Sequence, residues 1–104
     1  SSSESIKSKF DIQTFAQVLS ENNIFIKELN DQQRKFISEF IVDYALNKTG
    51  IDWQIRESIV ARFRMQIRRQ LKKIKLNENL IESAVEFLIE KAIELSLNAQ
   101  KNNI

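Results

Sequence analysis

Apolar residues recur at helical spacing in four stretches of the chain. They lie three and four positions apart in residues 11–20, 31–47, 53–74 and 78–97, a period that predicts amphipathic α-helices. Residues 24–29 are ambiguous, because Ile24 and Ile26 alternate as in a strand, but one strand without a partner makes no sheet. We expect a connector or a short helical turn there. The pattern therefore predicts an all-α fold, a single compact domain of about four main helices.

The ends of these helices carry recognisable signals. Asn30 is a good N-cap for the second helix, and Gln33 occupies the capping-box position three residues later. Gly50 can take the left-handed conformation that follows a helix end. Asp52 and Asn77 are the candidate N-caps of the third and fourth helices.

The apolar faces of the helices define the expected core. Trp53 opens the third helix and is expected to fix its angle to the second. The fourth helix has a wide apolar stripe, so it should bury more than one side. The expected core positions are Ile12, Phe15, Ala16 and Leu19; Phe36, Ile37, Phe40, Ile41 and Tyr44; Ile59, Val60, Phe63, Ile67, Leu71 and Ile74; and Ile81, Ala84, Val85, Phe87, Leu88, Ile89, Ala92, Ile93 and Leu95.

Composition excludes several classes of function. The 104 residues include one Gly and no Pro, Cys or His, which excludes a glycine-rich phosphate loop, disulfides, and metal or acid–base sites built on Cys or His. No apolar run is long enough to span a membrane, and the first residues lack the apolar middle of a signal peptide. Residues 1–9 are serine-rich and are expected to be a linker, followed by one helical domain over residues 10–104. We expect no catalytic residues and no metal ligands in this chain.

Charge is distributed unevenly along the chain. The whole sequence has a net charge of only +2, yet residues 52–75 contain eight basic and two acidic residues, a net charge of +6. The remaining residues contain eight basic and twelve acidic residues, a net charge of −4. The third helix is therefore strongly basic. Its candidate DNA-phosphate ligands are Arg62, Arg64, Arg68, Arg69, Lys72, Lys73 and Lys75.

Two interpretations of the basic helix remain open. On a helical wheel, Arg62, Arg68, Arg69 and Lys72 lie opposite the apolar face, so we expect them to face solvent and to contact DNA phosphates without reading sequence. The alternative is an ordinary solvated face, or one paired with acids elsewhere. Such acids recur at every fourth residue of the last helix, at Glu78, Glu82, Glu86, Glu90 and Glu94. This row of glutamates could be a solubilising face, a partner-docking face or a salt-bridge lattice with the basic helix.

Arg56 is the one charged residue that the wheel places on the apolar side of the third helix. A buried arginine is costly unless it is paired. It would pair with Asp43, Glu39 or Glu57 or stack on Trp53; alternatively the first turn extends past the core and leaves it in solvent.

The sequence of residues 52–73, DWQIRESIVARFRMQIRRQLKK, resembles a signature near the C-terminus of the motor and endonuclease (R) subunit of type I restriction enzymes. Weaker similarity continues through the last helix, giving a core motif over residues 52–95. Gln54 and Val60 depart from the family's usual Thr and Arg, and residues 74–79 replace its Tyr-Gly-Tyr-Pro-Pro-Asp-like turn. The ungapped matches are Asp52, Trp53, Arg56, Glu57, Ser58, Ala61, Arg64, Arg69, Leu71 and Lys73.

The resemblance implies a parent subunit that translocates DNA using ATP and cleaves it, with ATP and Mg²⁺ in its motor and nuclease domains. This chain has none of those motifs, so it resembles only the non-catalytic C-terminal helical module, which needs no cofactor. The implied partners are the modification and specificity subunits and the DNA backbone, in the cytoplasm of a bacterium or archaeon. Trp53, Arg56 and Glu57 would be structural or docking residues. The alternatives are a pure protein–protein docking module with no DNA role and a stand-alone nucleic-acid-binding helical protein.

Overall fold

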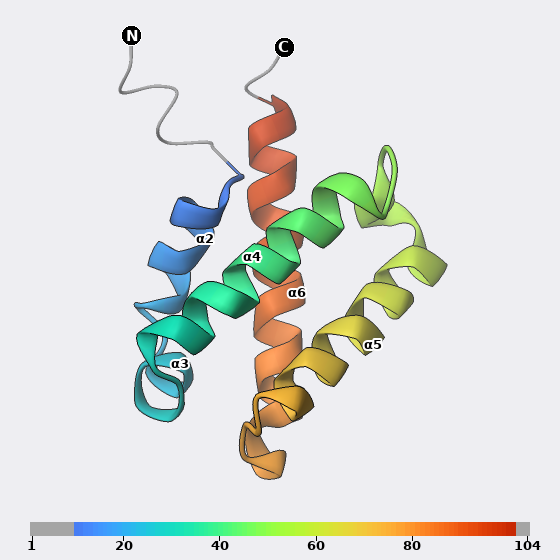
Figure 1. The fold of residues 1–104 in the computed structure, drawn as a ribbon. Coiled ribbons are helices and arrows are strands. Elements are labelled where there is room, and N and C mark those ends of the chain that lie inside the picture. Colours follow the sequence, from blue (N-terminus) through green and yellow to red (C-terminus); the bar gives the residue numbers. More distant parts are fainter. Residues whose placement is uncertain (1–9, 102–104) are drawn as a thin grey trace, which may run out of the picture.

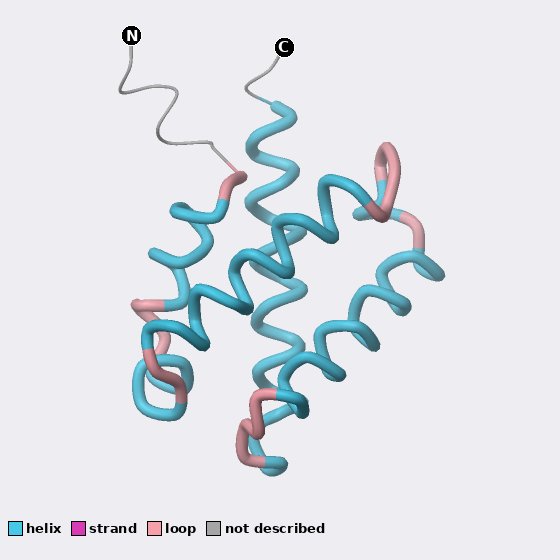
Figure 2. Tube along the Cα trace, viewed as in Figure 1, coloured by secondary structure: helices cyan, strands magenta, loops and turns pink. Residues whose placement is uncertain are grey.

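Helices make up all the regular secondary structure in residues 10–101, the part of the chain that the computed structural model describes. This confirms the predicted all-α class with four main helices. The predicted linker, residues 1–9, lies outside the described residues. The elements are α2 (Ile12–Leu19), α3 (Asn23–Glu28), α4 (Asp31–Asn47), the 3₁₀ turn η1 (Trp53–Ile55), α5 (Glu57–Lys73) and α6 (Glu78–Lys101) (Figures 1 and 2).

The ambiguous segment around residues 24–29 is a short helix, α3. Asn22 caps it, because its side-chain oxygen accepts hydrogen bonds from the backbone N–H groups of Ile24 and Phe25. Arg34 of α4 then donates to the backbone carbonyls of Phe25 and Leu29. These bonds satisfy carbonyls that a helix end leaves without partners, so α3 is joined to α4 by side-chain bonds as well as by the chain.

α4 begins with the predicted capping box. Asn30 accepts from the Gln33 N–H at 2.8 Å, and the Gln33 side chain accepts from the Asn30 N–H at 2.9 Å. The buried arc of α4 differs from the prediction, because Phe36 is 37% exposed whereas Ser38 is fully buried. α4 packs against α2 as well as against α5 and α6, and the Ser38 hydroxyl is satisfied by donating to the Arg34 carbonyl at 2.9 Å. The buried residues of α4 are Ile37, Ser38, Ile41, Val42 and Ala45.

The predicted third helix is two elements, and this is a correction. Gly50 takes the expected left-handed conformation (φ 89°), but Asp52 is left-handed as well (φ 58°) and its side chain caps nothing. η1 follows, and Arg56 then has an extended backbone before α5 starts at Glu57. A continuous helix would have put Arg56 on the buried face; the break leaves it exposed and so avoids burying an unpaired charge.

The turn between α5 and α6 is a Schellman motif. The Leu76 N–H donates to the Leu71 carbonyl at 3.1 Å and the Lys75 N–H donates to the Lys72 carbonyl at 3.0 Å, the two bonds that define this helix ending. Leu71 and Leu76 are both buried. Lys75 occupies the left-handed position (φ 64°) where glycine is usual. α6 then runs to Lys101, four residues past the predicted end at Leu97.

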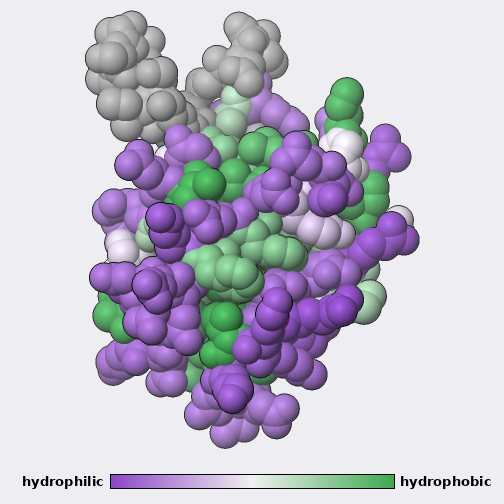
Figure 3. All heavy atoms as spheres, in the orientation of Figure 1, coloured by the Kyte–Doolittle hydropathy of each residue, from purple (hydrophilic) through white to green (hydrophobic). Residues whose placement is uncertain are grey.

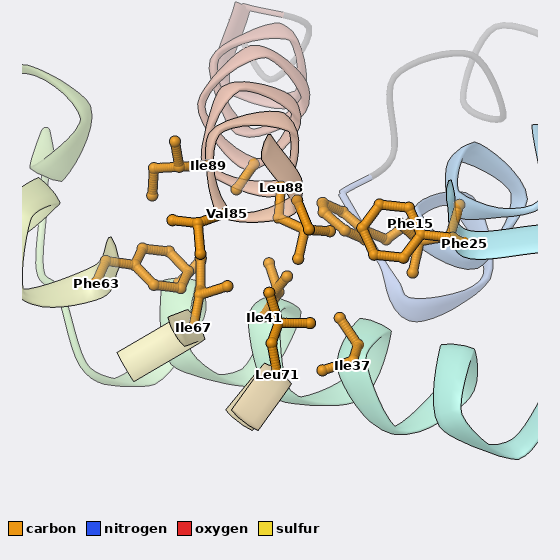
Figure 4. Close-up of a cluster of buried hydrophobic side chains, with 14 of the residues drawn as sticks. Phe15, Phe25, Ile37, Ile41, Phe63, Ile67, Leu71, Val85, Leu88 and Ile89 are labelled. Carbon is orange, nitrogen blue, oxygen red and sulfur yellow. The ribbon is translucent and has the colours of Figure 1, made fainter. Parts of the chain in front are cut away.

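The core lies where α4 crosses in front of α6, with α2 and α3 on one side and α5 on the other (Figure 1). Side chains from all five α-helices meet there (Figure 4). Phe25 of α3 packs on Phe87 of α6 with ring centroids 5.6 Å apart. The largest fully buried apolar side chains are Phe15, Leu19, Phe25, Ile37, Ile41, Phe63, Ile67, Leu71, Val85, Leu88 and Ile89. The predicted core is therefore largely confirmed, but Ile12, which was expected in it, is 39% exposed.

Candidate nucleic-acid interface and docking surface

α5 buries one face, which holds Val60, Phe63, Ile67 and Leu71. Successive residues of a helix are rotated by about 100°, so this face determines where the seven candidate phosphate ligands point. They divide into two groups. Arg64 and Arg68 lie on the flank of α5 that meets α6, and the others lie on the outer face or just beyond the helix end.

Arg64 and Arg68 form ion pairs with α6. Arg68 Nε and Nη2 donate to the two carboxylate oxygens of Glu82 at 2.7 and 2.8 Å. Arg64 Nε and Nη2 donate in the same two-pronged way to Glu86 at 2.9 and 3.2 Å. Arg68 was predicted to face solvent with Arg62, Arg69 and Lys72, and this is wrong, because it lies on the flank that meets α6 and is paired there. The salt-bridge lattice, one of the alternatives for the glutamate row, is confirmed for Glu82 and Glu86.

The Arg68–Glu82 ion pair shifts the pKa values of both side chains. The hydrogen bonds from Arg68 hold the pKa of Glu82 below its ordinary value, and the positive charges of Arg68 and Lys72 act in the same direction. The hydrogen bonds to Glu82 raise the pKa of Arg68. Both side chains are partly exposed, so the pair contributes little to the stability of the fold.

Five cations remain on or beside the outer face of α5. All five are exposed, and within residues 10–101 no carboxylate lies within ion-pair distance of them. The predicted solvent exposure of Arg62, Arg69 and Lys72 is thus confirmed. We call this set the outer basic face: Arg62, Arg69, Lys72, Lys73 and Lys75.

Trp53 is the buried aromatic residue of the α4–α5 connection, which comprises residues 48–56. It is 3% exposed, and its ring lies 5.2 Å from that of Phe63, centroid to centroid. This confirms its predicted role as a core residue. The next residue, Gln54, is also buried, and its Nε2 donates to Ser96 Oγ on α6 at 2.7 Å. No local sequence pattern indicates this bond, because 42 residues separate its partners.

Arg56 and Glu57 are both exposed. Arg56 Nε donates to the backbone carbonyl of Ile51 at 3.3 Å. Of the alternatives left open for Arg56, the solvent-exposed one is confirmed, and pairing with Asp43, Glu39 or Glu57 is not observed among the described residues.

Among residues 10–101, no three Asp or Glu side chains are grouped so that they would hold a metal ion. No helix in that range is both long and apolar enough to cross a bilayer.

These features define a small helical domain with a basic outer surface and a structured α4–α5 connection. Residues 8–98 match a family described as "Type I restriction enzyme HindI endonuclease subunit-like, C-terminal", and the chain belongs to that family. Over 82 residues it is 30% identical to the type I restriction enzyme HindI endonuclease subunit of Haemophilus influenzae. That alignment covers 79% of this chain but only 8% of the relative. No solved structure matches the chain.

Proposed function

We propose that this chain is a non-catalytic C-terminal module of a type I restriction endonuclease subunit. It serves assembly with the modification and specificity subunits, and its outer basic face contacts the DNA backbone without reading sequence. The parent subunit would supply ATP-driven translocation and DNA cleavage from other domains, where ATP and Mg²⁺ would bind, and the complex would act in the cytoplasm of a bacterium or archaeon.

The DNA role rests on the division of the basic residues of α5 into two groups, one paired with α6 and one facing solvent. Arg64 and Arg68 are paired with glutamates of α6, whereas none of the five cations of the outer basic face forms an ion pair with a carboxylate of the described residues. Lysine and arginine side chains that face solvent in this way can neutralise phosphates, which releases counterions and supplies affinity for any sequence. The family membership supports a place for this surface beside DNA.

Salt dependence of DNA binding tests the proposal. Each phosphate contact that is lost should lower the slope of log affinity against log salt by about 0.9 for duplex DNA. Arg69→Gln combined with Lys72→Gln should therefore lower the slope by about two units and weaken all sequences alike. The matched control, Lys27→Gln with Lys35→Gln, removes the same charge from exposed positions on α3 and α4. Fluorescence anisotropy on random-sequence duplexes would measure both.

Equal slopes for the two double variants would show that net charge, not the outer basic face, sets binding. A docking module with no DNA role is the second candidate, favoured by the exposed isoleucines of the α4–α5 connection. It predicts no salt-dependent DNA binding by the unsubstituted chain. Deleting the module from its subunit should weaken assembly with the modification and specificity subunits under both candidates, and normal assembly after deletion would contradict both.

A further inference from the structure

Three aromatic side chains form a row along one flank of α4, and one end of the row is open to solvent. Tyr44 contacts Phe63 of α5, and the Phe40 ring lies 5.8 Å from the Tyr44 ring, centroid to centroid. Phe36 continues this aromatic row one turn earlier and, at 37% exposed, is the most accessible aromatic ring of the described residues. Figure 3 shows hydrophobic surface along the middle of α4, with hydrophilic surface over α5 beside it. The exposed end of the row can therefore contact another molecule.

The exposed end of the aromatic row lies beside the C-terminal end of α5. Gln33 Nε2, in the first turn of α4, lies 3.5 Å from the carbonyl oxygen of Ile74, which follows the last residue of α5. Phe36 is one turn from Gln33 along α4, and Lys73 directly precedes Ile74. The accessible ring and this cation therefore flank the same contact between the two helices.

Charge around this contact divides between the two helices. Lys73 and Arg69 are four residues apart on the side of α5 away from the flank that pairs with α6, and residues 58–75 contain no Asp or Glu. α4 instead has two exposed acids, Glu39 and Asp43, within two turns of the exposed end of the row. An anionic strand is therefore attracted to α5, and the part of it that lies against α4 must be uncharged.

A single strand of DNA meets both conditions. Its phosphates bind exposed lysines and arginines whatever the sequence. Its bases are uncharged, and an unpaired base presents a flat face that stacks on an exposed aromatic ring. The base pairs of a duplex are stacked on one another inside the double helix, so they offer no free face to a ring on the protein surface.

We propose that Phe36 and the neighbouring part of the outer basic face form a binding site for single-stranded DNA. The phosphates lie on Arg69 and Lys73 of α5, and one base stacks on the Phe36 ring of α4. The inference rests on the proposed function, because it names a form of DNA that the outer basic face binds. Duplex DNA would use the same cations without the ring.

The test compares the binding of a labelled mixed-sequence single strand with the binding of the same sequence as a duplex, by fluorescence anisotropy. Phe36→Ala should weaken single-strand binding at least about fivefold and leave duplex binding unchanged. Phe36→Leu, which keeps an apolar side chain but has no aromatic face, should weaken it to a similar extent. Arg69→Gln with Lys73→Gln should weaken binding of both forms.

The matched control is Leu46→Ala, which removes a 63% exposed apolar side chain from the other end of α4 and should bind as the unsubstituted chain does. A second variant reports the stacking directly. Phe36→Trp should retain single-strand binding, and its added fluorescence should be quenched by the single strand but not by the duplex. Thermal unfolding above the assay temperature would establish that each variant is folded.

Failure of the site and failure of the proposed function give different results. If Arg69→Gln with Lys73→Gln weakens DNA binding but Phe36→Ala does not, the DNA role stands and the stacking site is wrong. Equal weakening of single-strand and duplex binding by Phe36→Ala, or full single-strand binding by Phe36→Leu, would also overturn the site. If the unsubstituted chain binds neither form, the DNA part of the proposed function fails and the site fails with it.

Discussion

Tyr44 of α4 stacks on Phe63 of α5, with ring centroids 4.6 Å apart and 29° between the ring planes. Trp53 packs on the same Phe63 ring at 5.2 Å. One fully buried phenylalanine therefore joins α4, the α4–α5 connection and α5. This contact sets the angle at which α5 leaves the connection, and so the direction of the outer basic face.

Phe63→Ala should lower the free energy of unfolding by about 3–5 kcal/mol, because it leaves a cavity where α4, the α4–α5 connection and α5 pack together. Urea unfolding monitored by Trp53 fluorescence would measure the loss and would also report the altered surroundings of the indole. Met65→Ala, two residues further along α5 at an exposed position, should change stability by less than about 0.5 kcal/mol. A comparable loss in both variants would contradict the packing described here.

The buried Gln54–Ser96 pair predicts a non-additive mutant cycle. Gln54 Oε1 is buried and has no hydrogen-bond partner among the described residues, so the amide depends on the single bond from its Nε2 to Ser96. Ser96→Ala should destabilise by about 1–3 kcal/mol, because it leaves the whole amide unsatisfied. Gln54→Leu with Ser96→Ala should be close to neutral, because it removes both polar groups. Additive losses in chemical denaturation would show that the bond does not form.

The Arg68–Glu82 pair predicts a defined pH dependence. The folded state lowers the pKa of Glu82 below its ordinary value of 4.5. Its contribution to stability is therefore fully present above the unfolded-state pKa and is lost as the pH falls through the lower, folded-state pKa. Between about pH 6 and 3, the unsubstituted chain should lose more stability than Glu82→Gln. The effect should be small because the pair is exposed. Parallel stability–pH curves for the two proteins would refute the pairing.

Lys75 predicts a gain in stability from a glycine. It is a non-glycine residue at the left-handed C′ position of α5 (φ 64°), a conformation that costs an L-residue about 1 kcal/mol. Lys75→Gly should therefore stabilise the domain by about 0.5–1 kcal/mol. Lys73→Gly, at the last residue of α5, should instead destabilise by up to about 1 kcal/mol. Both variants lose the same charge, so thermal unfolding of the pair separates backbone strain from electrostatics.

Local chemistry in the sequence was enough to predict several features. The helical period of the apolar residues determined the all-α class. The Asn30–Gln33 capping box and the left-handed Gly50 were readable because each involves residues only a few positions apart. The basic character of residues 52–75 was also readable, because charge is a property of composition and does not depend on packing.

Only the tertiary structure decided which basic residues remain available and where the third helix is broken. Arg68 lies 14 residues from Glu82 and Arg64 lies 22 residues from Glu86, so their pairing depends on how α6 folds back along α5. A wheel drawn for one helix separates its buried and exposed faces but cannot show what lies along the flank. Likewise, the break at Arg56 lets Trp53 and Gln54 both be buried while the guanidinium stays in solvent. The break therefore allows burial of two side chains without the free-energy cost of burying an unpaired charge. Both the burial and that cost depend on contacts between helices, which a local sequence pattern does not contain.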